Sequence, residues 1–207
     1  MTPNAALLVV DMQNDFMPGG ALAVPRGHEI VEPINRLAQR FANVVLTQDW
    51  HCPGHASFAS SQPGRQVYET IDAFYGPQIL WPDHCVMGTQ GAALHPDLDI
   101  PHAGLILRKG YPKAVDSYSA FLEADRETRT GLDGWLNSRG ITEVVICGLA
   151  TDFCVGWTAC DGRHFGLTVR VVEEASRAID LDGSMARAHR NMDIAGANFV
   201  TISELLG

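Results

Sequence analysis

The sequence has few charged residues and no cluster of basic ones. Only 19% of its 207 residues are charged, and 15 Lys and Arg against 24 Asp and Glu give a formal net charge of −9. Nucleic acids and anionic membranes attract clustered Lys and Arg, so neither is an expected partner. No apolar run approaches the roughly 18 residues of a membrane span, and the start, MTPNAALLVVDMQ, lacks the basic region and cleavage site of a signal peptide. We therefore expect a cytoplasmic protein.

Cysteines are also few, and their spacing is not that of a framework. The five are Cys52, Cys85, Cys147, Cys154 and Cys160, and no two form a CxxC pair. Neither a disulfide scaffold nor a zinc ribbon is expected, and in a reducing cytosol all five thiols should be free. Most free cysteines are buried and inert, so a reactive one has to be identified by its position in the fold.

Short apolar runs alternate with helix-like segments along the chain. Hydrophobic residues make up 46% of the sequence, as in a folded globular protein. The runs are nearly continuous in Val, Ile and Leu, as strands covered on both faces should be. This pattern predicts an α/β fold with a doubly wound, mostly parallel six-stranded sheet and helices on both faces. The expected strands are 5–10, 43–48, 104–109, 143–148, 167–172 and 198–202, and the expected helices are 28–41, 127–139, 153–165 and 183–197.

The stretch from about residue 50 to 103 breaks this pattern. It is rich in Pro, Gly, His and aromatic residues and has no long periodicity. A connection of that length in a compact domain usually carries function, and its aromatic residues argue against disorder. We therefore expect one domain over residues 1–207 with a long functional insertion at about 50–103.

Four chemically active side chains fall at the ends of four expected strands. Asp11 follows the first run, Asp49 the second and Lys109 ends the third, while Cys154 lies in the turn after the fourth. Ligands of an open parallel sheet bind outside the carboxyl ends of its strands. Asp11 could take the proton of the Cys154 thiol, and the Lys109 ammonium together with a helix N-terminus would favour the thiolate. The small residues of GLAT (148–151) would let a substrate approach the backbone, so that the Ala150 and Cys154 amides could face an oxyanion.

Two other residues of GLATDFCV have simpler interpretations. Cys147 lies within the strand and should be a buried, inert thiol. Asp152 is interpreted as a cap for the first turn of the following helix rather than as a catalytic acid.

A second group of residues has the chemistry of metal ligands. Asp49 and His51 lie two residues apart in DWHCPGH, so an extended chain points both side chains the same way, and WPDHC adds His84. Carboxylate and imidazole together suit Zn²⁺, Fe²⁺ or Mn²⁺. Histidines in a loop can equally well face solvent, and the spacing alone leaves the two interpretations about even.

Several motifs together resemble one family. In order they are VVDMQNDFMPGGALAVPRG, TQDWHCPGHASFAS, ILWPDHCVMGTQGAALHP, LRKGYPKAVDSYSAF and VICGLATDFCV. Over nearly the whole chain they are similar to the nicotinamidase (pyrazinamidase) branch of the isochorismatase-like cysteine hydrolases. DMQNDF marks the superfamily, and QDWH with WPDHC marks its metal-binding nicotinamidases.

The resemblance implies the isochorismatase-like hydrolase fold and a role for each matching residue. It implies a catalytic triad of Asp11, Lys109 and Cys154, an oxyanion hole of the Ala150 and Cys154 amides, and a cis peptide at Leu149–Ala150. It also implies one divalent metal ion (Zn, Fe or Mn) and no organic cofactor. The metal ligands would be Asp49, His51 and His84, with His55 as a further candidate, and Phe16, Trp81 and Tyr118 would line the substrate pocket.

The activity implied is hydrolysis of nicotinamide, and of pyrazinamide, to the acid and ammonia through a thioester in NAD salvage. Homo-oligomerisation is left open. Two alternatives remain. Another amidase or hydrolase of the superfamily would lack the Asp49, His51 and His84 set, and a silent ligand-binding or scaffold protein would have an inert Cys154.

Overall fold

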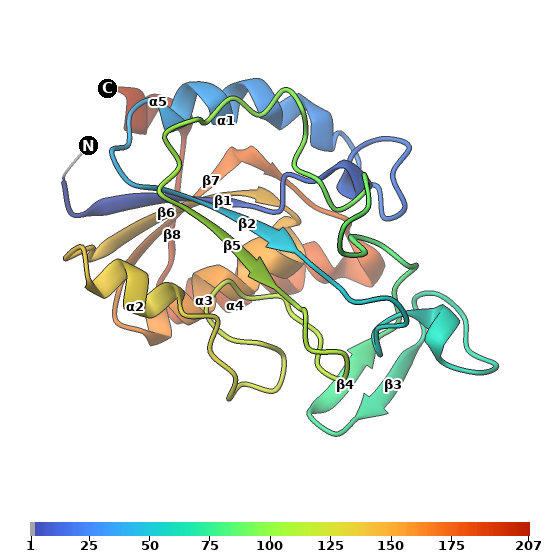
Figure 1. Ribbon diagram of the computed structural model, residues 1–207. Coiled ribbons are helices and arrows are strands. Elements are labelled where there is room, and N and C mark those ends of the chain that lie inside the picture. The colour runs from blue at the N-terminus through green and yellow to red at the C-terminus, as the bar shows by residue number, and fades with distance from the viewer. Residues whose placement is uncertain (1–2) are drawn as a thin grey trace.

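A single parallel sheet organises the chain. The computed structural model describes residues 3–207. Its six-stranded sheet has the order β5-β2-β1-β6-β7-β8, and every neighbouring pair is parallel (Figure 1). The predicted fold class is therefore confirmed. The sheet strands are β1 (Ala5–Val10), β2 (Val44–Asp49), β5 (Leu105–Lys109), β6 (Glu143–Leu149), β7 (Thr168–Arg177) and β8 (Asn198–Val200).

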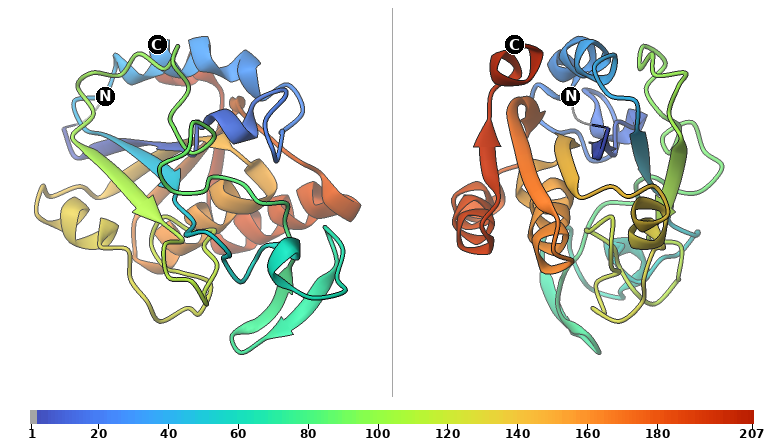
Figure 2. Two further views of the ribbon diagram at one scale, coloured as in Figure 1. Left: turned by 45° about the vertical axis from the view of Figure 1, so that its right-hand side comes forward. Right: turned by 90° about the vertical axis from the view of Figure 1, so that its left-hand side faces the viewer.

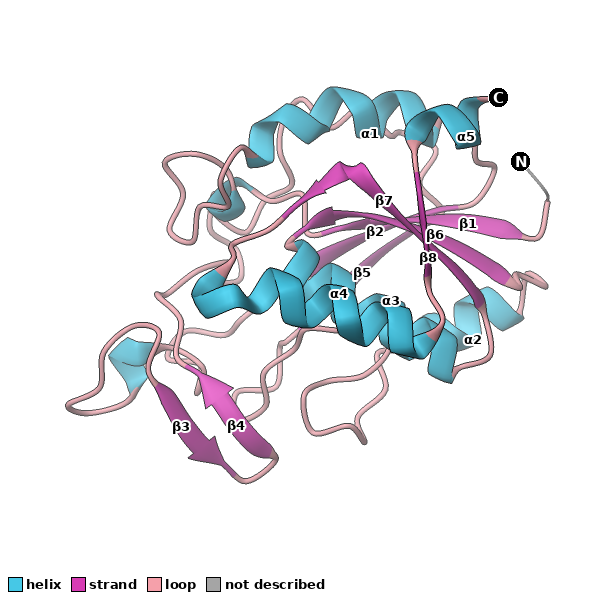
Figure 3. Ribbon diagram, turned by 180° about the vertical axis from the view of Figure 1, so that it is seen from behind, coloured by secondary structure: helices cyan, strands magenta, loops and turns pink. Residues whose placement is uncertain are grey.

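Helices cover the sheet on both faces. On one face lie α1 (Val31–Ala38) and α5 (Ile202–Leu206), side by side in both views of Figure 2. On the other face α3 (Gly156–His164) and α4 (Ser184–Ala195) run next to each other beneath the sheet (Figure 3). Because both faces are covered, every residue of β1 is buried, as its unbroken apolar sequence predicted.

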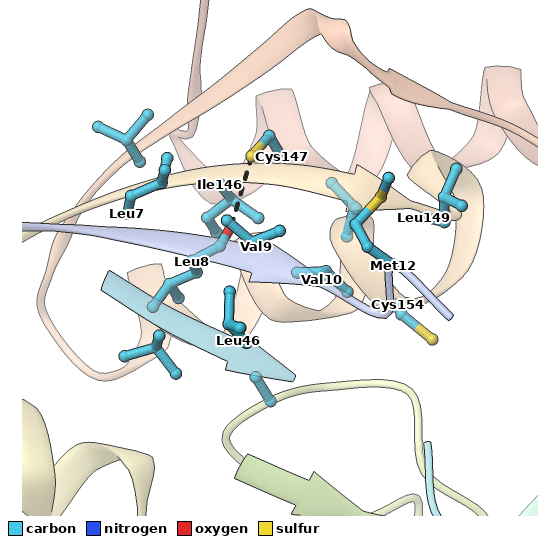
Figure 4. Packing of buried hydrophobic residues seen from close by; sticks show 14 of the residues in the cluster. Leu7, Leu8, Val9, Val10, Met12, Leu46, Ile146, Cys147, Leu149 and Cys154 are labelled. Carbon is cyan, nitrogen blue, oxygen red and sulfur yellow. Dashed lines mark hydrogen bonds between the residues drawn. The ribbon is translucent and has the colours of Figure 1, made fainter. Parts of the chain in front are cut away.

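Cys147 belongs to this core. It is fully buried in β6, and its Sγ lies 3.8 Å from the Leu8 carbonyl oxygen. Figure 4 shows it among the strand side chains, whereas Cys154 lies beyond the end of β1 with its sulfur directed away from them. Burial raises the pKa of the Cys147 thiol well above its usual value. The interpretation of Cys147 as an inert core thiol agrees with this packing.

The helix expected over 127–139 is shorter than predicted. Only α2 (Leu132–Asn137) is helical. The preceding residues turn back on themselves, because Glu123 N donates to Thr128 O and the Asp125 carboxylate accepts from Thr128 N. Gly131 then has a φ of 93°, outside the helical region. Local polar bonds thus compete with the helix for this backbone.

The segment from about 50 to 103 is ordered mostly by turns. It contains a short 3₁₀ turn, Ala59–Ser61, and an antiparallel hairpin of β3 (Thr70–Ala73) and β4 (Gly76–Ile79). This hairpin projects from the sheet at the carboxyl ends of its strands in Figures 1 and 3. Among residues 3–207, no helix has both the length and the apolar character that a bilayer crossing needs.

Candidate active site

The strand order creates a switch point between β1 and β6. From β1 the chain continues outward through β2 and β5, and from β6 it continues in the opposite direction through β7 and β8. A crevice forms outside the carboxyl ends of the strands at such a point. Asp11 directly follows β1, and Cys154 follows β6 in a single π-helical turn, Thr151–Val155. The two side chains therefore meet although they are far apart in sequence.

Lys109 joins the acids and the thiol into one buried cluster. Its Nζ lies 3.0 Å from Asp11 Oδ2 and 3.4 Å from Cys154 Sγ, and it also contacts Asp49 Oδ1. Asp11 and Lys109 are fully buried, and Cys154 is 6% exposed. The structure thus brings together the three residues for which the sequence predicted a triad.

Burial and charge set the protonation of this cluster at rest. Burial raises the pKa of the Cys154 thiol well above its usual value, because the attraction of Lys109 does not offset desolvation and two neighbouring carboxylates. Burial and Asp49 likewise raise the pKa of Asp11, against the opposing effect of Lys109. Burial lowers the pKa of Lys109, but Asp11 and Asp49 outweigh it and hold the group charged. Burial thus favours the protonated thiol and makes the Asp11 carboxylate more basic, while Lys109 opposes both effects.

Thr47 fixes the orientation of Asp11. Its hydroxyl donates to Asp11 Oδ1 over 2.5 Å and accepts from Asp11 N over 3.1 Å. Asp11 itself has a φ of 49°, which is uncommon for a residue other than glycine. Sequence reasoning missed Thr47, although a polar residue two positions before Asp49 on the same face of a buried strand was a usable signal.

The turn after β6 brings Ala150 and Cys154 to one pocket. The Leu149–Ala150 peptide is cis, as the resemblance implies, and both Ala150 and Cys154 line the pocket. Gly148 precedes them with a φ of 117°, and a Cβ there would collide with the backbone of Val10. Only glycine therefore lets β6 approach β1 this closely.

Asp152 does not cap its own helix. Its carboxylate instead accepts from the backbone amides of Ile179 and Asp180 over 3.0 and 2.7 Å and from the Ser184 hydroxyl. The predicted cap is therefore wrong, because these donors from the β7–α4 connection occupy the carboxylate. Its position outside the catalytic cluster agrees with the prediction that Asp152 is not the catalytic acid.

Asp49, His51 and His84 converge beside the triad with the donor set of a metal site. Asp49 Oδ2 lies 3.7 Å from His51 Nε2 and 3.8 Å from His84 Nε2. The Nδ1 atoms of His51 and His84 face the carbonyl oxygens of Gly110 and Pro82, respectively. Because carbonyl oxygens only accept, each Nδ1 carries the proton, and each Nε2 is unprotonated with a lone pair available. Within residues 3–207, the buried His51 Nε2 has no hydrogen-bond partner. This orphaned lone pair fits a cation.

A charged carboxylate completes that donor set. Burial raises the pKa of Asp49, but the adjacent Lys109 ammonium opposes this, and the pKa lies well below the usual range. Gln13 fixes the Asp49 backbone on both sides, because its amide donates to Asp49 O and accepts from Asp49 N, each over 2.8 Å. Sequence reasoning did not single out Gln13, which lies in the DMQ segment directly after β1.

His55 is buried beside His51 but already has partners. Its Nε2 faces the carbonyl oxygens of Pro112 and Val115 at 3.0 and 3.2 Å, and its Nδ1 lies 2.8 Å from Ser57 Oγ. Carbonyls only accept, so Nε2 carries the proton and Nδ1 accepts from Ser57. This arrangement favours a role for His55 in holding the 112–115 loop, although one of its ring nitrogens also lies close to a ring nitrogen of His51 and to a carboxylate oxygen of Asp116.

Aromatic side chains enclose the space between the thiol and the metal-type cluster. The predicted pocket residues Phe16, Trp81 and Tyr118 all line it, and Trp81 Nε1 donates to Tyr118 OH over 3.0 Å. The pocket holds about 20 Å³, room for about one water molecule. Entry of an aromatic ring therefore requires a wall side chain to move. Further lining residues include Leu22, Phe153 and Ile179.

Asp116 is a further pocket residue that sequence reasoning missed. It is 1% exposed, and its Oδ2 accepts from Gln78 Nε2 over 2.6 Å. Through this bond β4 of the projecting hairpin reaches the wall of the pocket. Asp116 lies two positions before Tyr118, in a loop without periodicity. The sequence therefore contained nothing that distinguished it from an acidic residue on the surface.

A thiol, a carboxylate and an ammonium gathered at the switch point of a doubly wound sheet are typical of cysteine-dependent α/β hydrolases. Comparison with known proteins narrows this class. Residues 5–204 match the model of the isochorismatase domain. The chain belongs to the isochorismatase family, in the group that contains the nicotinamidases, and the resemblance seen in the motifs is confirmed.

Individual relatives agree over nearly the full length. A nicotinamidase of Acinetobacter baylyi is 52% identical over 98% of this chain and 95% of its own length. A solved nicotinamidase and pyrazinamidase structure from Acinetobacter baumanii is 52% identical, covers 99% of each chain and superposes with a TM-score of 0.98.

Two solved relatives contain ligands. Yeast nicotinamidase bound to the inhibitor nicotinaldehyde is 31% identical over 95% of this chain and 99% of its own, with a TM-score of 0.89. A pyrazinamidase of Pyrococcus horikoshii in complex with zinc is 34% identical over 96% of this chain and 99% of its own, with a TM-score of 0.78.

Proposed function

We propose that this protein is a metal-dependent cysteine amidohydrolase that converts nicotinamide, and also pyrazinamide, to the carboxylic acid and ammonia through a thioester, in NAD salvage. The observation that carries the proposal is the contact of Lys109 with both Asp11 and Cys154 at an aromatic pocket that also holds Asp49 and His84. The relatives that act on nicotinamide or pyrazinamide, one with zinc bound, support the same substrate class and a divalent cation.

In the first half-reaction, Asp11 removes the Cys154 proton as the sulfur attacks the carboxamide carbon. Lys109 stabilises the negative charge that passes from the carboxylate to the sulfur. The Ala150 and Cys154 amides hold the tetrahedral oxyanion. Protonated Asp11 then gives its proton to the amide nitrogen, ammonia leaves, and an acyl thioester remains.

In the second half-reaction, Asp11 acts again as the base. It takes a proton from a water molecule that attacks the thioester carbonyl, and the same amides hold the second oxyanion. Collapse releases the carboxylic acid, and Asp11 returns the proton to the Cys154 sulfur. The cluster is thus restored with atoms and charge in balance.

Asp49, His51 and His84 would hold the cation. When bound, it supplies a Lewis acid that can hold the pyridine nitrogen and fix the ring. A donor set of one carboxylate and two imidazoles suits Zn, Fe or Mn. His55, with both ring nitrogens engaged, is not included in this ligand set.

Ammonia release from nicotinamide, with and without chelator, tests this function. The purified protein is expected to release one ammonia for each nicotinate formed. Removing the metal should greatly reduce kcat/KM, and restoring a stoichiometric divalent ion should recover it. Unchanged kinetics in a protein shown by elemental analysis to be metal-free would contradict the ligand set. It would favour the alternative that the chain acts as another amidase of the superfamily, without a metal ion.

The pH dependence should report on Asp11. The base must be deprotonated, and its pKa is raised above the ordinary 3.8, so kcat/KM should fall as the pH decreases through an apparent pKa above that value. Thermal unfolding curves at each pH serve as the control for loss of the folded state. A kcat/KM that stays constant down to pH 3.8 would refute Asp11 as the base.

The proposal includes a cytoplasmic location, because a catalytic thiol has to remain reduced. All five cysteines, which lie within the described residues, are free. No nucleic-acid or membrane partner and no organic cofactor is proposed, and the reaction needs only residues of one chain.

A further inference from the structure

A second and larger cavity lies directly behind the catalytic pocket. It holds about 580 Å³, compared with about 20 Å³ for the catalytic pocket. Its walls come from β4, from the first turns of α3 and from α4. The mechanism above does not use this outer cavity. A volume of this size accommodates a small organic group.

Among residues 3–207, the lining residues that the two cavities share are Tyr118 and Phe153. Their ring centroids lie 5.8 Å apart, with an angle of 38° between the planes. Both rings also contact Trp81 on the catalytic side. Together they form a thin aromatic partition between the space that faces Cys154 and the outer cavity.

Phe153 is the part of the partition that can be removed without leaving a polar group unsatisfied. Tyr118 accepts from Trp81 Nε1 at 3.0 Å and from Gln78 Nε2 at 3.4 Å, so truncating it would leave the buried Trp81 Nε1 donor without a partner. Phe153 is 8% exposed, and its ring packs against Trp81 at a centroid distance of 5.0 Å and against Tyr118. It also directly precedes Cys154, and both residues line the catalytic pocket.

The near side of the outer cavity suits an uncharged aromatic group. Ile79, Gly156, Trp157 and Ala188 contribute apolar surface there. The charged side chains are already engaged with partners in the protein. Arg126 is paired with Asp161, and Arg187 donates to the carbonyl oxygens of Leu181 and Asp182. The Asp152 carboxylate is likewise bonded to the β7–α4 connection.

We infer that Phe153 sets the upper size limit of the substrate ring, and that the outer cavity is a latent subsite for an aryl extension of an aromatic carboxamide. This inference rests on the proposed amidase function. With Phe153 in place, the acyl pocket ends at the partition. With a small residue there, the pocket continues into the outer cavity, and a second fused ring can occupy it while the carboxamide remains at Cys154.

The test compares nicotinamide with quinoline-3-carboxamide, which keeps the pyridine nitrogen and carboxamide and adds one fused ring. Ammonia release is measured for the wild type and for Phe153→Ala, Phe153→Leu and Trp157→Ala. The ratio of kcat/KM for the larger amide over nicotinamide should rise on the order of 10–100-fold in Phe153→Ala, and less in Phe153→Leu. Trp157→Ala is the matched control, because it enlarges the outer cavity and removes a ring that packs on Tyr118 but leaves both partition residues in place, and its ratio should stay at the wild-type value.

Two results would overturn the inference. One is an unchanged ratio in both folded Phe153 variants that still hydrolyse nicotinamide. The other is an equal rise in Trp157→Ala. If Phe153→Ala is folded but inactive, calorimetric titration with quinoline-3-carboxylate replaces the assay, and failure to bind this acid more tightly than the wild type refutes the subsite. If it does not fold, Phe153→Leu decides. Failure of the proposed function itself would be seen separately, as a wild type that releases no ammonia from nicotinamide.

Discussion

Replacing Cys154 with serine is expected to reduce ammonia release from nicotinamide by about 10⁴–10⁶-fold, the range seen when a member of a catalytic triad is removed. Serine keeps the size of the side chain and its place in the buried turn. A hydroxyl is a much weaker acid than a thiol, however, and Asp11 has to deprotonate the nucleophile without help from a histidine. The rate of the first half-reaction therefore collapses, while the fold and the pocket are retained.

Cys160→Ser is the matched control for this substitution. Cys160 lies in α3 close to Cys154 in sequence and is half-buried in the outer cavity, away from the cluster. Its replacement should leave kcat/KM near the wild-type value. Calorimetric binding of nicotinate to Cys154→Ser shows that the pocket is intact. A Cys154→Ser enzyme that retained the native rate would remove the nucleophile from the mechanism and favour a scaffold protein with an inert thiol.

Replacing Lys109 with methionine is expected to damage stability and activity together. Lys109 is the shared cation of Asp11 and Asp49, and all three side chains are buried. Removing one partner of a buried ion pair leaves uncompensated charge and costs about 3–5 kcal/mol of unfolding free energy. For a chain of this length each kcal/mol lowers Tm by about 2–4 °C. Thermal and denaturant unfolding at neutral pH measure the loss.

The pH dependence distinguishes lost charge from lost packing. Without the ammonium, the pKa values of both carboxyls rise, because burial is then less opposed. As the pH falls through these raised values the carboxyls become neutral, so the deficit of Lys109→Met relative to the wild type should shrink in acid. Lys113→Met, at an exposed position of the following loop, should show no deficit. A deficit independent of pH would indicate that Lys109 stabilises the fold by packing alone.

The sequence was sufficient to predict the sheet and its ligand edge, because both depend on local signals. Unbroken apolar runs located β1, β2, β5 and β6, and parallel strands necessarily place Asp11, Asp49 and Lys109 at one edge. The length of α2 was not predictable in the same way. The expected helix included 127–131, but hydrogen bonds from the backbone amides of Glu127 and Thr128 to the Asp125 carboxylate decide the conformation there.

The supporting residues of the site were hidden for a different reason. Thr47, Gln13 and Asp116 act through partners that lie 36 to 38 positions away in the chain. Neither residue type nor spacing indicates which distant backbone or carboxylate such a side chain will meet. Asp152 illustrates the same limit, since its position before a helix predicted a local cap, while the fold supplied donors from the β7–α4 connection.

That misassigned carboxylate has a consequence for the dynamics of the pocket. Asp152 lies two residues before the nucleophile, and its carboxylate accepts a hydrogen bond from the backbone amide of Ile179. Ile179 in turn lines the catalytic pocket. The sulfur and this wall are therefore coupled through one side chain, although they belong to different crossovers of the sheet. A displacement of the β7–α4 connection would therefore be passed to the turn that carries the sulfur, so the width of the pocket and the alignment of the attacking atom are set by the same two hydrogen bonds.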